Sequence, residues 1–350
     1  MRVLIVRIGA MGDVLHALPA VAALRERHPD WFIGWAIEPK LSDLLQIAGD
    51  SDDLSQGVGP SAKALIDRWY RVPALAWRRR PLAWGTISDI LSLRQVLRRE
   101  RFDVCVDMQG ALKSAVVGHM AGAGVFTGMA KPREWAARWL YNHRVDPTAA
   151  HVVEQGCELL SASFGEVLRP VRVPLPMDEE DERWAAGVVG HERFCLISPS
   201  AGWGAKVWPA ERYGQLAAEL GRAGIGTVVN APVEGNAEAE RVVETSEGFA
   251  RAVPSSLGQL IALVRRAAVV IAGDTGPLHL AAALERPVVG IYGPTDPRRN
   301  GPYAKRADAR VKVLRDPASL TSHRRAGDAE PGLLRIEVNQ VVQAALEVMG

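Results

Sequence analysis

The sequence has few of the features that mark secreted, metal-binding or membrane-spanning proteins. Its 350 residues include only three cysteines, which are widely spaced and form no metal-binding pattern (Cys105, Cys157 and Cys195). This usage favours a reducing compartment. No run approaches the roughly 20 apolar residues of a membrane helix, so we expect any membrane contact to be peripheral. The start, Met1 to Ile8, is too short and too charged for a signal peptide.

Net charge is also small. A value of +2 gives no general reason to expect nucleic-acid binding, and a composition of 48% hydrophobic and 23% charged residues is that of a soluble globular protein. The length predicts two domains, which we place at 1–168 and 169–332. A Pro-rich crossing near 164–178 joins them. A C-terminal helix follows at 333–350, and we expect it to be able to pack back on the first domain.

Short apolar runs alternate with amphipathic stretches along both halves. We expect strands near 2–8, 32–37, 69–72, 103–108, 125–129, 194–198, 225–230, 267–272 and 287–292. We expect helices near 13–24, 40–47, 86–99, 111–122, 133–142, 150–163, 209–221, 234–244, 256–266, 278–284 and 335–348. The pattern predicts an α/β fold of two doubly wound parallel sheets that face each other across a cleft. Ligands of such sheets bind beyond the carboxyl ends of the strands.

Some local features refine these elements. Pro19 predicts a kink or a restart in the first helix. Thr86 or Ser88 is a candidate cap for the helix at 86–99, and Ser256 with Gln259 forms a capping box.

The turn at 273–279 organises the second half. A buried strand ends at Gly273, and Asp274-Thr275-Gly276-Pro277 leads into a helix that carries His279. Free backbone N–H groups at such a helix start bind anions, and a glycine lets a phosphate approach closely. The plainer interpretation is a helix capped by Asp274 or Thr275 with a satisfied histidine.

A second helix start carries a carboxylate near the beginning of the chain. Asp13 follows Gly12 at the first helix, where the dipole favours an ionised acid that can accept a proton. Without other evidence, Asp13 is best interpreted as the N-cap of this helix. His16 lies on an apolar face of the same helix and can line the cleft.

The loop from Ser198 to Pro209 carries one cation, Lys206, at a strand's carboxyl end. Lys206 can neutralise a departing diphosphate, although an isolated loop lysine is usually a solvated surface group. Ser200, Ala201 and Gly202 belong to the same loop. Glu234 follows the next strand and can hold ribose hydroxyls, with Glu238 as a competing choice.

Three further groups have both a functional and a structural interpretation. Arg78, Arg79 and Arg80, flanked by Trp77 and Trp84, are either a solvated face or a surface for phosphorylated lipid or anionic membrane. Gln109, Lys113 and Ser114 either contact an acceptor or start a helix. The acids at 178–182 open a helix, where the dipole favours them more than a metal does. His151 and Glu154 share a helix face and are more typical of structure than of catalysis.

Jointly these stretches resemble the bacterial lipopolysaccharide heptosyltransferases of glycosyltransferase family 9. The resemblance rests on Met11-Gly12-Asp13-Val14-Leu15-His16-Ala17-Leu18-Pro19, Asp107-Met108-Gln109-Gly110-Ala111-Leu112-Lys113-Ser114, Lys206-Val207-Trp208-Pro209, Gly273-Asp274-Thr275-Gly276-Pro277-Leu278-His279 and Tyr292-Gly293-Pro294-Thr295-Asp296-Pro297. The first two look more like type I than type II members.

The resemblance implies a GT-B fold with two facing Rossmann-like domains. It also implies metal-independent, inverting transfer of heptose from ADP-heptose to a Kdo residue of Kdo-lipid A. Asp13 then resembles the general base and Lys206 the diphosphate contact. Asp274, Thr275, Gly276 and His279 resemble the donor pocket, Glu234 the ribose contact, and Arg78 to Arg80 the contact to lipid phosphates. The implied protein is a cytoplasmic monomer, peripheral on the cytoplasmic face of the inner membrane.

One departure concerns the donor loop, where relatives can offer threonines and this chain has Ala201 and Gly202. Ser200 or backbone N–H groups would replace those hydroxyls. Three alternatives stay open: a type II or III heptosyltransferase, a sugar-nucleotide epimerase of similar fold, and a nucleotide-sugar-binding protein at the membrane surface.

Overall fold

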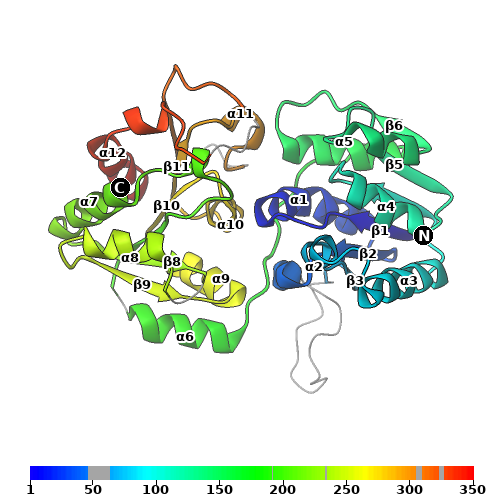
Figure 1. Cartoon of the computed structure of the whole chain (residues 1–350), viewed down its shortest axis with the longest axis horizontal. Helices are drawn as coiled ribbons and strands as arrows, with labels where there is room; N and C mark the ends of the chain where they lie inside the picture. The colour runs from blue at the N-terminus through cyan, green and yellow to red at the C-terminus, as the bar shows by residue number, and fades with distance from the viewer. Residues whose placement is uncertain (46–63, 191, 233–234, 305–309, 323–326) are drawn as a thin grey trace. The chain divides into compact units, whose positions relative to one another are not determined.

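The chain folds into two compact units, which the computed structural model describes at residues 1–45, 64–190, 192–232, 235–304, 310–322 and 327–350. Unit 1 is Met1–Pro176 and unit 2 is Met177–Gly350, coloured from blue to green and from green to red in Figure 1. The division lies after Pro176 rather than after residue 168, so the Pro-rich crossing belongs mostly to unit 1. Each unit holds one six-stranded sheet.

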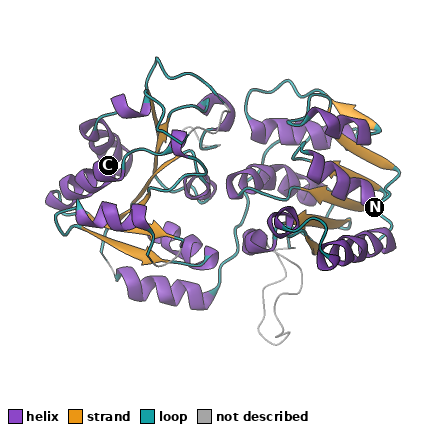
Figure 2. Ribbon diagram, in the orientation of Figure 1, coloured by secondary structure: helices purple, strands orange, loops and turns teal. Residues whose placement is uncertain are grey.

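Unit 1 is built on a parallel sheet with the strand order β3-β2-β1-β4-β5-β6. Its strands are β1 (Arg2–Val6), β2 (Phe32–Ile37), β3 (Arg68–Arg71), β4 (Val104–Asp107), β5 (Val125–Met129) and β6 (His143–Val145). In the centre Leu4 aligns with Gly34 of β2 and with Cys105 of β4. The middle strands are almost wholly buried because helices cover both faces, which explains their unbroken apolar runs (Figure 2).

Two layers of helices enclose this sheet. Helices α1 and α5 pack together in one layer, and α3, α4 and η2 are neighbours in the other. The helices of unit 1 are α1 (Met11–Arg27), η1 (Pro39–Leu44), α2 (Ala74–Arg79), α3 (Trp84–Arg99), α4 (Leu112–Met120), η2 (Trp135–Leu140) and α5 (Val152–Phe164). Leu93, Leu97, Ala115, Ala137 and Tyr141 join one core on the α3–α4–η2 side.

Unit 2 repeats the design with the strand order β12-β11-β10-β7-β8-β9, again all parallel. Its strands are β7 (Phe194–Ser198), β8 (Gly226–Ala231), β9 (Ala250–Pro254), β10 (Val269–Gly273), β11 (Val288–Tyr292) and β12 (Val311–Arg315). Its helices are α6 (Glu179–Val189), η3 (Gly204–Lys206), α7 (Ala210–Arg222), α8 (Ala237–Glu244), α9 (Leu257–Arg266), α10 (Gly276–Ala283), α11 (Pro297–Asn300), η4 (Leu333–Arg335) and α12 (Val338–Met349).

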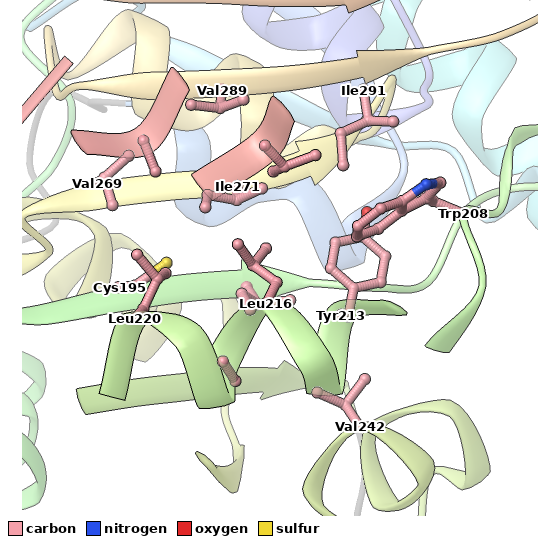
Figure 3. Packing of buried hydrophobic residues seen from close by; sticks show 14 of the residues in the cluster. Cys195, Trp208, Tyr213, Leu216, Leu220, Val242, Val269, Ile271, Val289 and Ile291 are labelled. Atoms are coloured by element: carbon pink, nitrogen blue, oxygen red, sulfur yellow. The ribbon is translucent and has the colours of Figure 1, made fainter. Parts of the chain in front are cut away.

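The largest described core lies in unit 2, between its sheet and helices α7, α8 and α12. Figure 3 shows the rings of Trp208 and Tyr213 next to each other in the core that also holds the strand residues Ile271 and Ile291. The ring centroids of Trp208 and Tyr213 are 4.8 Å apart at 90°, a favoured aromatic geometry. The C-terminal helix α12 is part of this core, through Val341, for example. We expected it as a separate segment able to return to the first domain; it instead completes unit 2.

The predicted fold class is confirmed, and the differences are local. Helix α1 starts at Met11 and runs through Pro19 unbroken. The stretch at 133–142 forms the 3-10 helix η2 instead of an α-helix. Helix α3 starts at Trp84, its N-cap Ala83 offers no side-chain capping bond, and the Thr86 hydroxyl donates to the Arg80 carbonyl at 2.8 Å. The Ser256–Gln259 capping box is confirmed.

No helix within the described residues is long and apolar enough to pass through a bilayer. The three cysteines are buried and free.

Candidate active site

The predicted residues of both units cluster just past the carboxyl ends of central strands. In unit 1, β1 leads to the turn before Asp13 and β4 leads to the turn at Gln109; the two strands are paired neighbours. In unit 2, β7 leads to the loop of Lys206 and β10 leads to Asp274, and these strands are also paired. Each unit therefore presents two adjacent turns at one edge of its sheet, the usual ligand edge of such folds.

Asp13 is the third residue of α1 and not its N-cap, which is Ala10. Its carboxylate accepts a hydrogen bond from the Ala10 backbone N–H at 3.2 Å and forms an ion pair with Arg7 Nη2 at 2.9 Å. Arg7 also donates to the Asp13 carbonyl at 3.0 Å and to the Met108 carbonyl of the neighbouring turn. The carboxylate is partly exposed, so it is oriented by Arg7 and still accessible to a ligand.

Asp107, at the end of β4, is a buried carboxylate that fixes the neighbouring turn. It accepts from the N–H groups of Gln109 and Gly110 and from the hydroxyls of Ser114 and Tyr141, at 2.7 to 3.2 Å. Burial raises the pKa of Asp107, and these four donors oppose the shift. The group is a structural anchor for the turn.

This arrangement shows the structural contacts of two residues that are also predicted to contact an acceptor. Ser114 is wholly buried, and its hydroxyl bonds within the turn. Gln109 is almost as buried, and its side-chain carbonyl accepts from the Ile8 N–H at 2.8 Å. Both side chains hold the turn in place, and their contact to an acceptor stays a prediction. Lys113, one residue before Ser114, is exposed.

His16 is nearly buried and lies edge to face with His151, with 5.7 Å between ring centroids. His151 is the N-cap of α5 and accepts from the Val153 N–H at 3.2 Å, so it is not on a helix face with Glu154 as expected. The structural role predicted for His151 is thus explained by its capping bond.

Lys206, Asp274 and His279 form a buried polar group at the edge of the second sheet. Lys206 Nζ donates to Asp274 Oδ2, and His279 Nε2 lies 3.0 Å from Asp274 Oδ1. Their side chains are 13%, 8% and 4% exposed. Burial alone raises the pKa of Asp274, but the hydrogen bond and charge of His279 and the charge of Lys206 outweigh it and hold the pKa well below its usual range.

The start of α10 is left open by this arrangement. Thr275 occupies the N-cap position, yet its side chain makes no capping bond and donates instead to the Gly273 carbonyl at 3.2 Å. Asp274 does not cap the helix either, because its oxygens face Lys206 and His279. The N–H groups of the first turn, including that of Gly276, have no side-chain cap, as an anion site requires.

The loop before Lys206 is open at Gly202, where an added Cβ would meet nothing within 4 Å. Ser200 donates to Glu238 of α8, joining the loops that follow β7 and β8. Ala201 is half-buried in this loop. Glu234, the predicted ribose contact, lies outside the described residues. Glu238, the competing choice, is described, and its carboxylate accepts from the Ser200 hydroxyl.

Arg78, Arg79 and Arg80 are exposed at the end of α2 and just beyond it. The acids at 178–182 begin α6, where Asp178 caps the helix and Glu182 pairs with Arg265 and Arg266. Within the described residues, no three His, Cys, Asp or Glu side chains gather as a metal site would require.

Sequence reasoning missed three residues that position the site. Arg7 forms an ion pair with Asp13, and the Tyr141 hydroxyl donates to Asp107. The centroid of the Trp203 ring lies 4.4 Å from Lys206 Nζ. Arg7 was detectable as a charge directly after a buried strand, six residues before Asp13. Nothing local marks the other two, because their contacts form only on folding.

Comparisons with known proteins find chains of similar sequence and fold. The family model "Glycosyltransferase family 9 (heptosyltransferase)" matches residues 90–325. Lipopolysaccharide heptosyltransferase 1 of Escherichia coli K12 is 30% identical over 322 residues, which are 87% of this chain and 92% of that protein. Lipopolysaccharide heptosyltransferase 2 of the same organism is 26% identical over 76% of this chain and 80% of its own length. The solved structure of E. coli heptosyltransferase WaaC with ADP superimposes with a TM-score of 0.77 at 27% identity, covering 99% of this chain and 100% of that one.

Proposed function

Because the chain belongs to glycosyltransferase family 9, the heptosyltransferases, we propose that it moves heptose from ADP-heptose to a Kdo residue of Kdo-lipid A in the synthesis of the lipopolysaccharide inner core. The chain is a glycosyltransferase with two Rossmann-like units of the GT-B type. The donor assignment is supported by the E. coli WaaC structures, solved with ADP and with ADP-2-deoxy-2-fluoro heptose.

One observation carries the donor half of this proposal: a buried lysine, held by a carboxylate, stands beside an uncapped helix start. In the proposed mechanism the diphosphate of the donor meets the amides at Thr275 and Gly276, and Lys206 offsets the negative charge that builds up as ADP leaves. Asp274 keeps Lys206 in place, so the cation is already oriented before the reaction. Glu234 stays the proposed contact to a ribose hydroxyl, and Glu238, which accepts from the Ser200 hydroxyl, is the competing candidate.

The acceptor half of the proposal rests on Asp13. Its carboxylate takes the proton of a Kdo hydroxyl while the hydroxyl oxygen attacks the anomeric carbon of heptose and the bond to ADP breaks, which inverts that carbon. Arg7 fixes the carboxylate for this step. Lys113 and the exposed arginines 78 to 80 are the proposed contacts to the acceptor's anionic groups.

The proposed location is the cytoplasm, peripheral on the cytoplasmic face of the inner membrane. The lipid nature of the proposed acceptor and the exposed arginines support this location.

The direct test incubates the purified chain with ADP-heptose and Kdo-lipid A, with and without a chelator, and determines the linkage and anomeric configuration of the product. We expect equal transfer in both arms with inversion. A parallel arm offers an acceptor that already carries the first heptose; a preference for it would identify a type II enzyme. An isomer formed from ADP-heptose without acceptor would identify an epimerase and reject the proposal.

A further inference from the structure

The α3–α4–η2 layer of unit 1 exposes apolar and aromatic side chains that its fold does not use. Most of the large hydrophobic side chains exposed in the described residues lie between Leu75 and Trp139. Such a concentration marks an interaction surface when it is contiguous, whereas isolated exposed hydrophobic residues are ordinary.

The most prominent part of this surface is the short helix η2. Trp135 is 58% exposed and Trp139 is 69% exposed. The guanidinium carbon of Arg138 lies 4.0 Å from the Trp135 ring centroid and 5.6 Å from that of Trp139. Its Nε has no hydrogen-bond partner in the described part of the chain. Two outward indoles therefore flank a cation.

Helix α4 extends this surface. Its Leu112 and Val116 are both exposed, and they lie on one side of the helix because they are four residues apart. Helices α4 and η2 are packed neighbours. Glu134, just before η2, accepts from the Leu112 N–H at 2.9 Å and donates its own N–H to the Gly110 carbonyl. The indoles are thus fixed to the turn that carries the proposed acceptor contacts.

Helix α3 adds a third stripe next to α4. The exposed side chains of Trp84, Ile87 and Leu91 recur at helical spacing, and exposed Arg94 and Arg98 continue the same stripe. By helical geometry this stripe lies beside the side of α3 that is buried through Leu93 and Leu97, and not on it. A helix of this kind has one apolar side for the core and a second, Trp- and Arg-bearing side that the described residues of unit 1 leave exposed.

Charge decides which partner fits. The exposed cations around these stripes include Arg78, Arg79, Arg80, Lys113 and Arg133. Of the nearby acids, Glu100 pairs with Arg2 and Arg68, and Asp146 pairs with Lys131. Glu134 accepts from the Leu112 N–H, and Asp89 of α3 accepts from the Trp77 indole N–H at 3.5 Å, so cations still outnumber acids on this surface. A second copy of the chain would bring like charges together, which disfavours a symmetric dimer through this face. A surface that combines tryptophan, aliphatic residues and arginine suits an anionic bilayer, with indoles at the headgroup level.

We infer that the outer face of the α3–α4–η2 layer, centred on Trp135 and Trp139, is the surface by which the protein docks on an anionic lipid bilayer. The inference goes beyond the exposed arginines of α2, because it assigns insertion to two indoles on η2. It also deepens the proposed function, on which its link to the acceptor rests: docking on this face places the Gly110–Lys113 turn beside the membrane.

The test is vesicle sedimentation of the full chain without donor or acceptor. We expect binding to vesicles containing phosphatidylglycerol, weak binding to pure phosphatidylcholine vesicles, and a decrease with salt. The double variant Trp135→Ala/Trp139→Ala should lower binding at least about tenfold, a loss of roughly 1.4 kcal/mol. The matched control, Val167→Ala/Leu320→Ala, removes two exposed apolar side chains elsewhere and should bind as the parent does. Circular dichroism and melting of both variants check their fold.

A kinetic arm separates this inference from the proposed function. The tryptophan variant should keep the parent's rate on a soluble, deacylated acceptor and lose it on acceptor embedded in vesicles. Unchanged vesicle binding by the tryptophan variant, or no vesicle binding by the parent, would overturn the inference even if transfer is normal. Conversion of a dimer to a monomer by the same variant, with vesicle binding unchanged, would assign the face to a second copy and also overturn it. An inactive parent that still binds vesicles through the two tryptophans would refute the transferase proposal alone.

Discussion

Asp274 is the residue whose replacement tests the donor half-site most sharply. The Asp274→Asn substitution keeps the shape of the side chain and removes its charge. Lys206 and His279 then lose the carboxylate that both contact. Removal of one partner from a buried ion pair costs about 3–5 kcal/mol, because the other charge stays buried without compensation. The new amide oxygen can still accept one hydrogen bond, so we expect a loss near 3 kcal/mol, at the lower end of that range.

A loss of about 3 kcal/mol corresponds to a decrease in Tm of roughly 6–12 °C for a domain of this size. Urea unfolding of the parent, Asp274→Asn, Lys206→Met and the double variant measures the effect as a thermodynamic cycle. Because the chain has two units, the transition of unit 2 is followed separately, for example by hydrogen exchange of β10. The cycle should give a coupling of about 0.5–3 kcal/mol between the two positions. The same variants should bind ADP more weakly, since Lys206 is no longer held beside α10.

Additive effects in the cycle, or an Asp274→Asn protein within about 0.5 kcal/mol of the parent, would refute the idea that this carboxylate holds the lysine. Normal ADP binding by a variant that unfolds early would separate the two roles and reject the link to the donor.

Three further predictions follow from single groups. Asp13→Asn should lower kcat by about 10²- to 10⁴-fold while ADP affinity measured by calorimetry stays unchanged; full activity would exclude Asp13 as the base. Gly128→Ala should cost about 1–3 kcal/mol in thermal unfolding, because the new Cβ would lie 2.4 Å from the Tyr141 ring, whereas Gly187→Ala on α6, where a Cβ meets nothing within 4 Å, should be neutral or stabilising. The lowered pKa of Asp274 stabilises unit 2 above the unfolded carboxyl value near 3.9, and that contribution is lost as the pH falls below it. The raised pKa of Asp107 has the opposite effect on unit 1. Burial of the charged carboxylate destabilises unit 1, and this destabilisation decreases as the pH falls and the carboxylate is protonated. The Asp274→Asn protein should therefore lose less stability than the parent in unit 2 as the pH falls from neutral to below about 4, measured by hydrogen exchange, and an equal loss in both proteins would contradict the sign for Asp274.

The central strands were predictable because burial on both faces demands continuous apolar runs, as in Val3–Val6 and Val269–Ala272. Three edge strands, β6, β9 and β12, were not predicted. They are short and partly exposed, and each carries an arginine, as in His143–Val145. An edge strand needs one apolar side at most, so its pattern is weak and only pairing with a neighbour reveals it.

Some features of the candidate site were likewise predictable from the sequence, and others appear only in the fold. Local turn chemistry identified the stretches around Asp13, Gln109 and Asp274, because a glycine or an acid after a buried strand has a local cause. Local turn chemistry did not reveal that the side chains of Ser114 and Gln109 are buried. Ser114 is held by a hydrogen bond to Asp107, and Gln109 by one from the Ile8 N–H, and nothing in the sequence distinguishes Asp107 from an ordinary residue at a strand end. The Lys206–Asp274 pair joins positions 68 residues apart in the chain and depends on the pairing of β7 with β10.

Each unit is one uninterrupted length of chain, and every strand pairs only within its own half. The order in which the ribosome delivers the residues therefore matters. All six strands of the first sheet have been synthesised before the first residue of the second sheet appears, so the amino-terminal half can fold while the rest is still being translated. A carboxyl-terminal truncation that removes α12 strips part of the second core and should leave a folded amino-terminal half attached to an unfolded remainder.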